Sequence, residues 1–326
     1  MLDNFCRDIN YLRISVTDRC NLRCRYCMPE EGIDKTVHSY ILSLEDLARL
    51  AQVASTLNIS KIRLTGGEPL VRKNITGLIN LIRQIETIDD LAITTNGILF
   101  AGMADDLKSA GLDRVNFSVD TLDDIKFEYI TRGGQLREVK KAVYKALELG
   151  LHPVKLNTVV IKGFNDDELL KFADLAYSYP LHIRFIEFMP IGDLRYWKKE
   201  RVMTISEMQE VIGREYPLQP AKRIIGNGPA KYFNFENGTG SIGFISPMSH
   251  HFCSACNRIR MTAEGKLRGC LYDKREIDLQ EAINTGASDE DLKQLFIKAI
   301  NLKPSQHHMD QGWGRDNRRK MYQIGG

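Results

Sequence analysis

The chain has 326 residues, of which 43% are hydrophobic and 27% are charged, and this composition excludes an intrinsically disordered protein. Its 45 basic and 42 acidic side chains leave a formal net charge of +3, too small for nucleic acid or an anionic membrane to be the main partner. Since the sequence has no apolar run of about 18 residues and no secretory leader, we expect a cytoplasmic protein without a membrane partner.

Short β-branched segments alternate with longer amphipathic segments from residue 11 to about residue 190, which is typical of βα units around a parallel sheet. The amphipathic stretch 42–55 is predicted to form a helix with Ser43 as its N-cap, because Asp46 follows three residues later. Further helices are predicted within 74–86, 136–150 and 288–302. Six strands are predicted, over Tyr11–Thr17, Lys61–Thr65, Leu91–Asn96, Arg114–Asp120, Val154–Ile161 and Leu181–Phe188.

One face of every predicted strand is apolar and the opposite face is polar or basic. In the first strand, Arg13 and Ser15 alternate with Leu12 and Ile14. Helices must cover the apolar face, so the polar face lines an interior that is not a packed core and that should hold a large polar ligand. The predicted fold is therefore α/β, an open and incomplete barrel with a polar lumen.

The pattern changes after Pro190. Residues 191–250 are rich in Gly, Pro and Asn, and they predict short hairpin strands without a βα rhythm. We therefore divide the chain into a barrel over residues 1–190 and a C-terminal region over residues 191–326.

Six of the seven cysteines form two tight groups, a pattern that favours metal centres over disulfides. Cys20, Cys24 and Cys27 follow the first predicted strand, at the end where active sites of such sheets gather. Three thiolates at this spacing can hold three corners of a [4Fe-4S] cube, whose fourth iron needs another ligand. Tetrahedral zinc completed by His38 is the alternative. Cys6 belongs to neither group, and we expect it to be a buried small hydrophobe or a free thiol.

The second group consists of Cys253, Cys256 and Cys270. Its spacing alone also fits a zinc ribbon completed by His250 or His251.

The segment CNLRCRYC resembles the CxxxCxxC signature of the radical S-adenosylmethionine enzymes, and Gly66-Gly67-Glu68-Pro69 matches their glycine-rich motif one βα unit downstream. With FCSACNRIR, Cys270 and the terminal Gly325-Gly326, the whole chain resembles the molybdenum cofactor biosynthesis protein A family, the GTP 3′,8-cyclases. The resemblance implies an incomplete (β/α)6 barrel related to the TIM barrel, with a C-terminal extension that carries a second [4Fe-4S] cluster.

The resemblance also implies the roles of individual residues. Cys20, Cys24 and Cys27 would ligate the first cluster, and Cys253, Cys256 and Cys270 the second. S-adenosylmethionine would be held by Tyr26, Gly67, Ser118 and Met189. GTP would be contacted by Arg13, Arg63, Thr94, Lys155, Arg258, Ile259 and Arg260. Residues with a catalytic role would be Arg13, Arg258, Arg260, Gly325 and Gly326.

The strand pattern itself adds Lys61 and Arg184 to this lumen as cations for a triphosphate. An ion pair with Asp120 or Glu187 is the alternative for these two side chains.

By the same resemblance the enzyme is a lyase that uses two [4Fe-4S] clusters and S-adenosylmethionine to abstract the ribose 3′-hydrogen of GTP. The substrate radical then closes onto C8 of guanine to give (8S)-3′,8-cyclo-7,8-dihydro-GTP, a precursor of molybdopterin. Implied partners are an electron donor and the next enzyme of the pathway, cyclic pyranopterin monophosphate synthase. The sequence does not decide whether the protein forms a homodimer.

Two other functions are weighed against this one. A radical S-adenosylmethionine enzyme that modifies peptides can also carry auxiliary clusters, but the lumen cations and the terminal glycines favour a nucleotide. A zinc-stapled nucleic-acid-binding protein would use the basic tail Arg315–Lys320, and the small net charge disfavours it.

Overall fold

The computed structural model of the protein describes residues 1–33, 41–191, 194–221, 228–309 and 319–325. These residues form one open α/β sheet of twelve strands in the order β12-β11-β10-β1-β2-β3-β4-β5-β6-β9-β8-β7. Eight strands, from β10 through β1–β6 to β9, are parallel, and antiparallel strands extend the sheet at both edges.

The strands are β1 (Tyr11–Ser15), β2 (Lys61–Thr65), β3 (Asp90–Thr95), β4 (Arg114–Ser118), β5 (Val154–Val160), β6 (Leu181–Glu187), β7 (Leu218–Pro220), β8 (Lys231–Phe235), β9 (Ser241–Ile245), β10 (Arg258–Met261), β11 (Lys266–Arg268) and β12 (Ile277–Asp278). The helices are α1 (Leu44–Ser55), α2 (Ile75–Arg83), α3 (Ala104–Ser109), α4 (Asp124–Thr131), α5 (Leu136–Glu148), α6 (Leu169–Ser178), α7 (Ile205–Glu215), α8 (Leu279–Asn284) and α9 (Asp289–Asn301).

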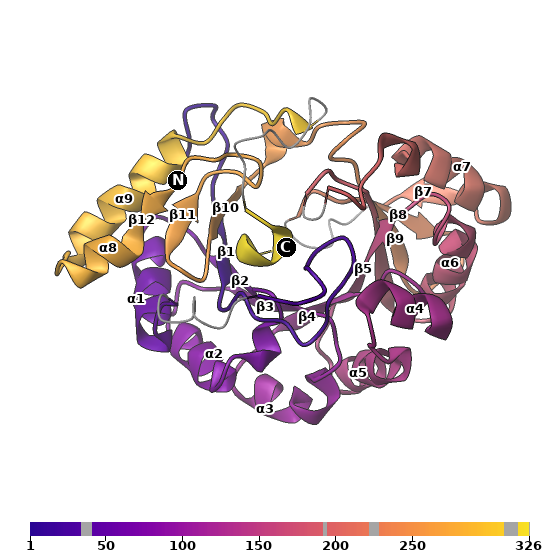
Figure 1. Ribbon diagram of the computed structural model, residues 1–326, viewed down its shortest axis with the longest axis horizontal. Coiled ribbons are helices and arrows are strands. Elements are labelled where there is room, and N and C mark those ends of the chain that lie inside the picture. Colours follow the sequence, from indigo (N-terminus) through magenta and orange to yellow (C-terminus); the bar gives the residue numbers. More distant parts are fainter. Residues whose placement is uncertain (34–40, 192–193, 222–227, 310–318, 326) are drawn as a thin grey trace.

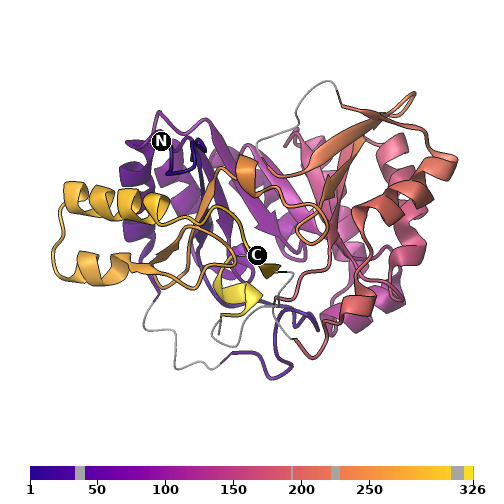
Figure 2. The same ribbon diagram turned by 90° about the horizontal axis from the view of Figure 1, so that it is seen from above.

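The helices surround the curved sheet on its outer side, and the segment that leads to the C-terminus lies inside the arc (Figure 1). Seen from above, that segment lies near the middle of the molecule (Figure 2). The longest described helices, α5 and α9, have 13 residues each. No helix in the described part of the chain has the length and apolar character needed to cross a bilayer.

The apolar strand faces pack against the helices as the alternation predicts. Leu12, Ile14 and Leu64 are 0% exposed and join Leu47 and Leu50 of α1 in one continuous core. Fully burying a large apolar side chain stabilises the folded state by about 1.5–3 kcal/mol. This layer is therefore the main source of stability. The opposite strand faces are thereby left to line the inner side.

The six predicted strands and the helix capped by Ser43 are confirmed, with strand ends shifted by one or two residues. The Ser43 hydroxyl accepts a hydrogen bond from the amide of Asp46 over 3.0 Å. The helix predicted within 288–302 is confirmed as α9, which begins with a capping box between Ser288 and Asp291.

The short hairpin strands predicted within 191–250 are confirmed by the antiparallel pairs β7–β8 and β8–β9, but the stretch also holds a helix that the sequence pattern does not predict. Helix α7 lies in this stretch, and it begins with a capping box between Thr204 and Glu207, a signal masked by the Gly, Pro and Asn around it. Beyond α7, strand β9 pairs in parallel with β6, and β10 pairs in parallel with β1. Residues after 190 thus extend both edges of the same sheet.

Gly240 shows how tightly β9 approaches the loop before β6. A Cβ atom at this position would lie 2.1 Å from the carbonyl oxygen of Leu181 and 2.6 Å from that of Ala176. We expect Gly240→Ala to lower the free energy of unfolding by about 1–3 kcal/mol, because the backbone must move apart.

Gly213 in α7 is the matched control, since a Cβ atom there meets no atom within 4 Å. Gly213→Ala should raise the free energy of unfolding by up to about 1 kcal/mol through helix propensity. Urea unfolding of both variants checks this pair of predictions, and equal effects would contradict the packing argument.

Candidate active site

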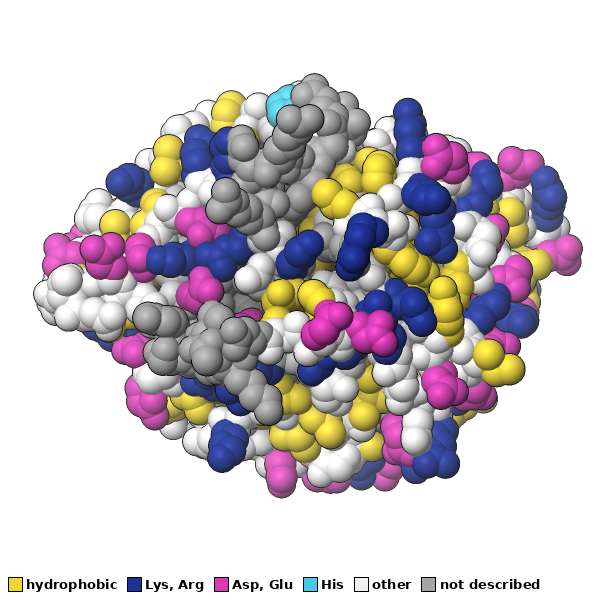
Figure 3. Space-filling view, in the orientation of Figure 1, with side chains coloured by type: hydrophobic (Ala, Val, Ile, Leu, Met, Phe, Trp, Pro, Cys, Tyr) yellow, Lys and Arg dark blue, Asp and Glu magenta, His cyan; other side chains and the backbone are white. Residues whose placement is uncertain are grey.

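An open cavity with about 1860 Å³ of empty space lies on the inner side of the sheet. All six cysteines of the two groups line it, although they lie far apart in the sequence. Lys and Arg side chains gather near the centre of the face seen in Figure 3. The other predicted site residues among its lining are Arg13, Tyr26, Arg63, Gly67, Thr94, Ser118, Arg184, Met189, Arg258 and Arg260.

Three arginines form a row across the sheet. The parallel register pairs Arg13 of β1 with Arg260 of β10 on one side and with Arg63 of β2 on the other. Because side chains at paired positions of parallel strands point to the same face, the three guanidinium groups face the cavity together. All three are at most half exposed, and Arg63 and Arg260 are buried.

The guanidinium groups of this row lie close enough for Arg260 and Arg63 to lower the pKa of Arg13, in addition to the larger effect of burial. Burial and the neighbouring cations lower the pKa of Arg63 and of Arg260 to about 10. Burial also lowers the pKa of Arg13 well below its ordinary value, and the charge of Arg260 adds to the effect. Burying several like charges side by side is costly. The row is therefore suited to an anionic ligand that carries several charges.

Orphaned polar atoms point to the same conclusion. Nε of Arg63, Nε of Arg184 and Oγ1 of Thr94 are buried and have no hydrogen-bond partner among the described residues. Buried polar groups are nearly always satisfied in folded proteins, so these atoms require a ligand or ordered water.

Lys155 and Arg184 lie beside the row on β5 and β6. Lys155 is 2% exposed, its amino group lies 5.8 Å from the ring centroid of Tyr232, and burial together with the charge of Arg184 lowers its pKa to about 5. Arg184 donates a hydrogen bond to Oδ1 of Asn116 over 2.6 Å. Lys155 is not among the residues that line the cavity.

The alternative ion pairs of Lys61 and Arg184 with Asp120 or Glu187 are absent from the described contacts. The Asp120 carboxylate accepts hydrogen bonds from the Tyr26 hydroxyl and the Val159 amide. Glu187 accepts hydrogen bonds from the amides of residues 205, 248 and 249. Lys61 is half-buried, lies outside the cavity lining, and pairs in register with Asp90.

The loop of the first cysteine group is held by the end of α4. The amides of Arg23 and Arg25 donate to the carbonyls of Thr131 and Ile130 over 3.0 and 2.9 Å. The Arg132 guanidinium donates to the carbonyls of Arg23 and Met28 over 2.8 and 3.1 Å, one on each side of the Cys24–Cys27 turn. Sequence reasoning missed Arg132, which carries no motif signal beyond its position before two glycines.

The first group fits a cationic metal cluster. Burial raises the pKa of Cys20 to about 11 and of Cys27 to about 12, and burial with the neighbouring thiols raises that of Cys24 well above its ordinary value. The protein alone therefore does not stabilise three thiolates here. Metal ions supply the compensating charge and deprotonate such thiols.

The residues predicted to hold S-adenosylmethionine lie beside this group. Tyr26 donates its hydroxyl to Oδ2 of Asp120 over 2.6 Å, which ties the cysteine loop to the end of β4. Burial raises the pKa of Asp120 to about 6 although the Tyr26 hydrogen bond opposes this. Ser118 and Met189 complete this end of the cavity.

The glycine-rich motif is explained by packing as well as by ligand access. A Cβ atom at Gly67 would lie 2.2 Å from the carbonyl oxygen of Arg19, and one at Gly66 would lie 2.5 Å from that of Thr17. The loops after β1 and β2 therefore touch through their backbones. Glu68 is buried and accepts hydrogen bonds from Thr95 Oγ1, Asn96 and Leu70, which joins the loop to β3.

The second group lies at the ends of β10 and β11 and has two cations that sequence reasoning missed. Lys303 places its Nζ 3.3 Å from Sγ of Cys256. Burial raises the pKa of Cys256, but Arg258 and Lys303 outweigh it and lower the pKa to about 6. Arg7 donates to the Cys253 carbonyl over 3.0 Å. No spacing rule could have assigned Lys303 or Arg7, because both come from distant segments.

The C-terminal segment enters the inner side of the sheet. Ile324 is 0% exposed and packs with Ile191 and Met309. The Arg260 guanidinium donates to the carbonyl of Gly325, and a Cβ atom at Gly325 would lie 2.5 Å from Oγ1 of Thr65. Gly325 also has a φ of 70°, in the region that favours glycine.

Some predicted residues lie elsewhere. The side chain of Ile259 is 0% exposed in the core on the opposite strand face, so only its backbone faces the site. Of the two alternatives for Cys6, the free thiol is confirmed, since this cysteine is unpaired with any other and exposed. His38, Gly326 and residues 315–318 of the basic tail lie outside the described residues.

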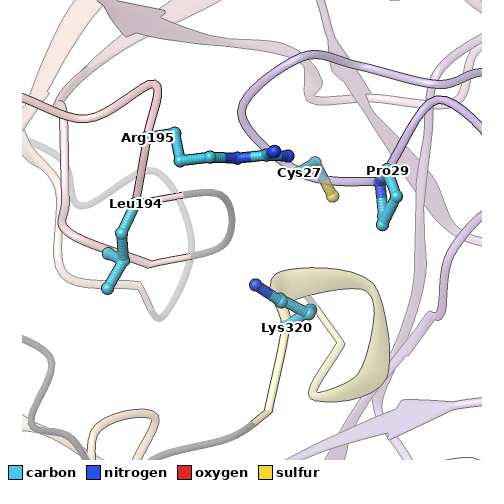
Figure 4. A pocket seen from close by; sticks show the side chains of 5 residues that line it. All are labelled: Cys27, Pro29, Leu194, Arg195 and Lys320. Carbon is cyan, nitrogen blue, oxygen red and sulfur yellow. The ribbon is translucent and has the colours of Figure 1, made fainter.

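A smaller cavity with about 600 Å³ of empty space approaches the first cysteine group from another side. It is lined by Cys27 and Pro29 of the cysteine loop, by Leu194 and Arg195 after β6, and by Lys320 of the C-terminal segment. Figure 4 shows Arg195 reaching toward Cys27, with Lys320 on the other side of the opening.

Residues 14–176 match the family model of the Radical SAM superfamily, and residues 181–309 match Molybdenum Cofactor Synthesis C. The chain is 17% identical to SuiB of Streptococcus suis at a TM-score of 0.58, over 84% of this chain and 64% of that chain, a likeness of fold alone. The fold and the cysteine loop thus define a radical S-adenosylmethionine protein, a class that implies an iron–sulfur cluster and S-adenosylmethionine.

Curated relatives narrow this class. The chain is 63% identical to the GTP 3′,8-cyclase of Syntrophomonas wolfei and 54% identical to that of Desulforamulus reducens. Each alignment covers 100% of both sequences. The chain therefore belongs to the GTP 3′,8-cyclase family.

Arg132→Ala should loosen the loop of the first cysteine group, because two hydrogen bonds from a charged donor, worth about 1.5–3 kcal/mol each, are lost. We expect faster amide exchange of residues 20–32 in the iron-free chain and about tenfold faster loss of iron to a chelator. Arg137→Ala on the exposed side of α5 is the control. Unchanged exchange in the Arg132 variant would refute the clamp.

Proposed function

We propose that this chain converts GTP into (8S)-3′,8-cyclo-7,8-dihydro-GTP in the synthesis of the molybdenum cofactor, with two [4Fe-4S] clusters and S-adenosylmethionine. The observation that carries the proposal is the row of Arg260, Arg13 and Arg63, which faces the same cavity as both cysteine groups. Full-length identity to GTP 3′,8-cyclases favours it over a peptide-modifying enzyme and over a zinc-stapled nucleic-acid-binding protein.

One end of the cavity would generate the radical. Cys20, Cys24 and Cys27 would hold the first cluster, and Tyr26, Gly67, Ser118 and Met189 would hold S-adenosylmethionine. When bound, these two groups supply a one-electron cleavage that yields a carbon radical able to abstract hydrogen. The protein contributes a rigid loop, anchored by Asp120 and Arg132, that keeps the reacting groups in place.

The opposite end would hold the substrate. Cys253, Cys256 and Cys270 would carry the second cluster and receive the guanine base. The triphosphate would lie along the arginine row and draw on Lys155, Arg184 and Lys61, because several cations in a low-dielectric site can neutralise about four negative charges. The backbone of Ile259, with Arg258 and Arg260, would contact the guanine end of GTP. The buried Thr94 hydroxyl, which has no hydrogen-bond partner among the described residues, would bond to GTP.

In this proposal residues 1–190 form an incomplete (β/α)6 barrel, and residues 191–326 extend its sheet at both edges and complete the site. Arg13, Arg258, Arg260 and the Gly325-Gly326 tail would act on the reacting nucleotide. An electron donor and cyclic pyranopterin monophosphate synthase would be the partners, in the cytoplasm.

The division of the cavity is tested with Cys24→Ala and Cys256→Ala. Cys24→Ala should abolish 5′-deoxyadenosine formation while GTP still binds, and Cys256→Ala should weaken GTP binding while S-adenosylmethionine cleavage persists. The parent enzyme, with GTP, S-adenosylmethionine and a strong reductant, should give 5′-deoxyadenosine and a cyclised nucleotide by mass spectrometry. Loss of cleavage with intact GTP binding in Cys256→Ala would overturn the assignment.

GTP binding should take up a proton at Lys155. Its pKa of about 5 leaves the amine neutral at pH 7, and a bound triphosphate raises that pKa toward the ordinary value near 10.5. Affinity should therefore fall as the pH rises between these values, by up to about tenfold per unit.

Calorimetry in buffers of different ionisation enthalpy, without S-adenosylmethionine, measures this proton uptake. Arg63→Ala should weaken binding by about tenfold or more yet keep the uptake, whereas Lys155→Met should lose it. Equal uptake in Lys155→Met and the parent would exclude Lys155 as the titrating group.

Deletion of Gly325 and Gly326 should sharply reduce GTP cyclisation and spare the iron content and basal S-adenosylmethionine cleavage. The reason is that Arg260 loses its carbonyl partner at Gly325, while Ile324 keeps the segment anchored. Product analysis and iron assays check this. Full cyclisation by the truncated chain would show that the tail is a passive end.

A further inference from the structure

We propose that His251, Cys253 and His307 form a binding site for one zinc ion, and that zinc held there blocks the loading of the second cysteine group with iron. Among the described residues, these three form the group of His, Cys and acidic side chains whose ligand atoms all lie within 4.8 Å of one another. Cys253 and His307 are buried, and His251 is exposed. The site is thus shielded on one side and accessible on the other.

The protein itself holds the segment of Cys253 against the segment that precedes His307, without a metal. Arg7, itself 5% exposed, donates to the carbonyl of Cys253 over 3.0 Å and to the carbonyls of Pro304 and Ser305 over 2.8 and 3.0 Å. Its charge is balanced by Asp3, 2.6 Å away. One buried guanidinium therefore fixes the loop before β10 against the segment after α9, and the metal site needs little ordering.

The geometry of the three side chains suits a tetrahedral ion. The rings of His251 and His307 stack with centroids 4.3 Å apart and planes 27° apart, so their edges can turn to one ion. Zinc bonds of about 2.3 Å to sulfur and about 2.1 Å to nitrogen place tetrahedral ligand atoms roughly 3.5 Å apart. The ligand atoms, which lie within 4.8 Å of one another, would move closer by side-chain rotation when the ion binds. The Met309 amide donates to Nδ1 of His307 over 3.3 Å, a long hydrogen bond that is readily replaced.

The donor set selects zinc over ferrous iron. One thiolate and two imidazoles suit Zn²⁺, which binds such sites more tightly than Fe²⁺ does. Cys256 stands apart, because Lys303 and Arg258 contact its sulfur. Cys253 is therefore the thiol that both sites share, and it cannot ligate zinc and a cluster in the same way at once.

Cobalt(II) is the spectroscopic probe for the zinc site, measured on the full chain with the first group changed to serine at Cys20, Cys24 and Cys27. We expect one Co²⁺ per chain with the absorption of a tetrahedral site that has one thiolate ligand, displaced by one Zn²⁺. His307→Ala and His251→Ala should each weaken binding by at least tenfold. Because His251 is exposed, its variant keeps the test valid if His307→Ala fails to fold.

His250→Ala and Cys270→Ser are the matched controls, since they neighbour the site without belonging to the group. Both should bind Co²⁺ as the parent does. Loss of binding in Cys270→Ser with retention in His307→Ala would assign the metal to the three cysteines and overturn the proposal, as would the absence of Co²⁺ binding.

The blocking of iron rests on the proposed second cluster and is tested separately with all six cysteines intact. Reconstitution should give about eight irons per chain, and about four when one equivalent of Zn²⁺ is added first. His251→Ala should retain about eight irons in the presence of zinc. About four irons without zinc would refute the second cluster, whereas about eight irons in the zinc-treated parent would refute the blocking.

Discussion

The parallel pairing of β10 with β1 is the constraint on which the site depends. It attaches a C-terminal strand to the N-terminal strand of the sheet, and its register places Arg260 beside Arg13 and thus in line with Arg63. The same pairing carries Cys253 and Cys256, which precede β10, to the cavity that the first cysteine group enters from the end of β1. A shift by one residue would turn every arginine of β10 into the core.

The cavity concentrates positive charge in the row of Arg260, Arg13 and Arg63 and in the neighbouring Arg184. Asp90 is engaged in an ion pair with Arg114, and Asp120 and Glu187 are held by other hydrogen bonds. The tail contributes the carbonyl of Gly325 to Arg260. Burying like charges side by side opposes the charged form of each arginine, so this arrangement favours an anionic ligand.

Much of this protein follows from its sequence. The period-two alternation of residues such as Arg13 with Leu12 and Ile14 predicts both the apolar core face and the polar lumen, because strand geometry is local. The spacing of Cys20, Cys24 and Cys27 predicts a metal loop for the same reason. The cap at Ser43 also acts within four residues and is correctly predicted.

Contacts between distant segments were decided only by the tertiary structure. Lys303 beside Cys256, Arg7 across the segments of Cys253 and Pro304, and Arg132 on the first cysteine loop belong to no motif, since nothing local ties them to their partners. The same holds for the meeting of His251, Cys253 and His307. The sequence by itself determined which strand faces and loops carry chemistry. Folding decided which of them meet, because strand order and register arise from packing over the whole chain.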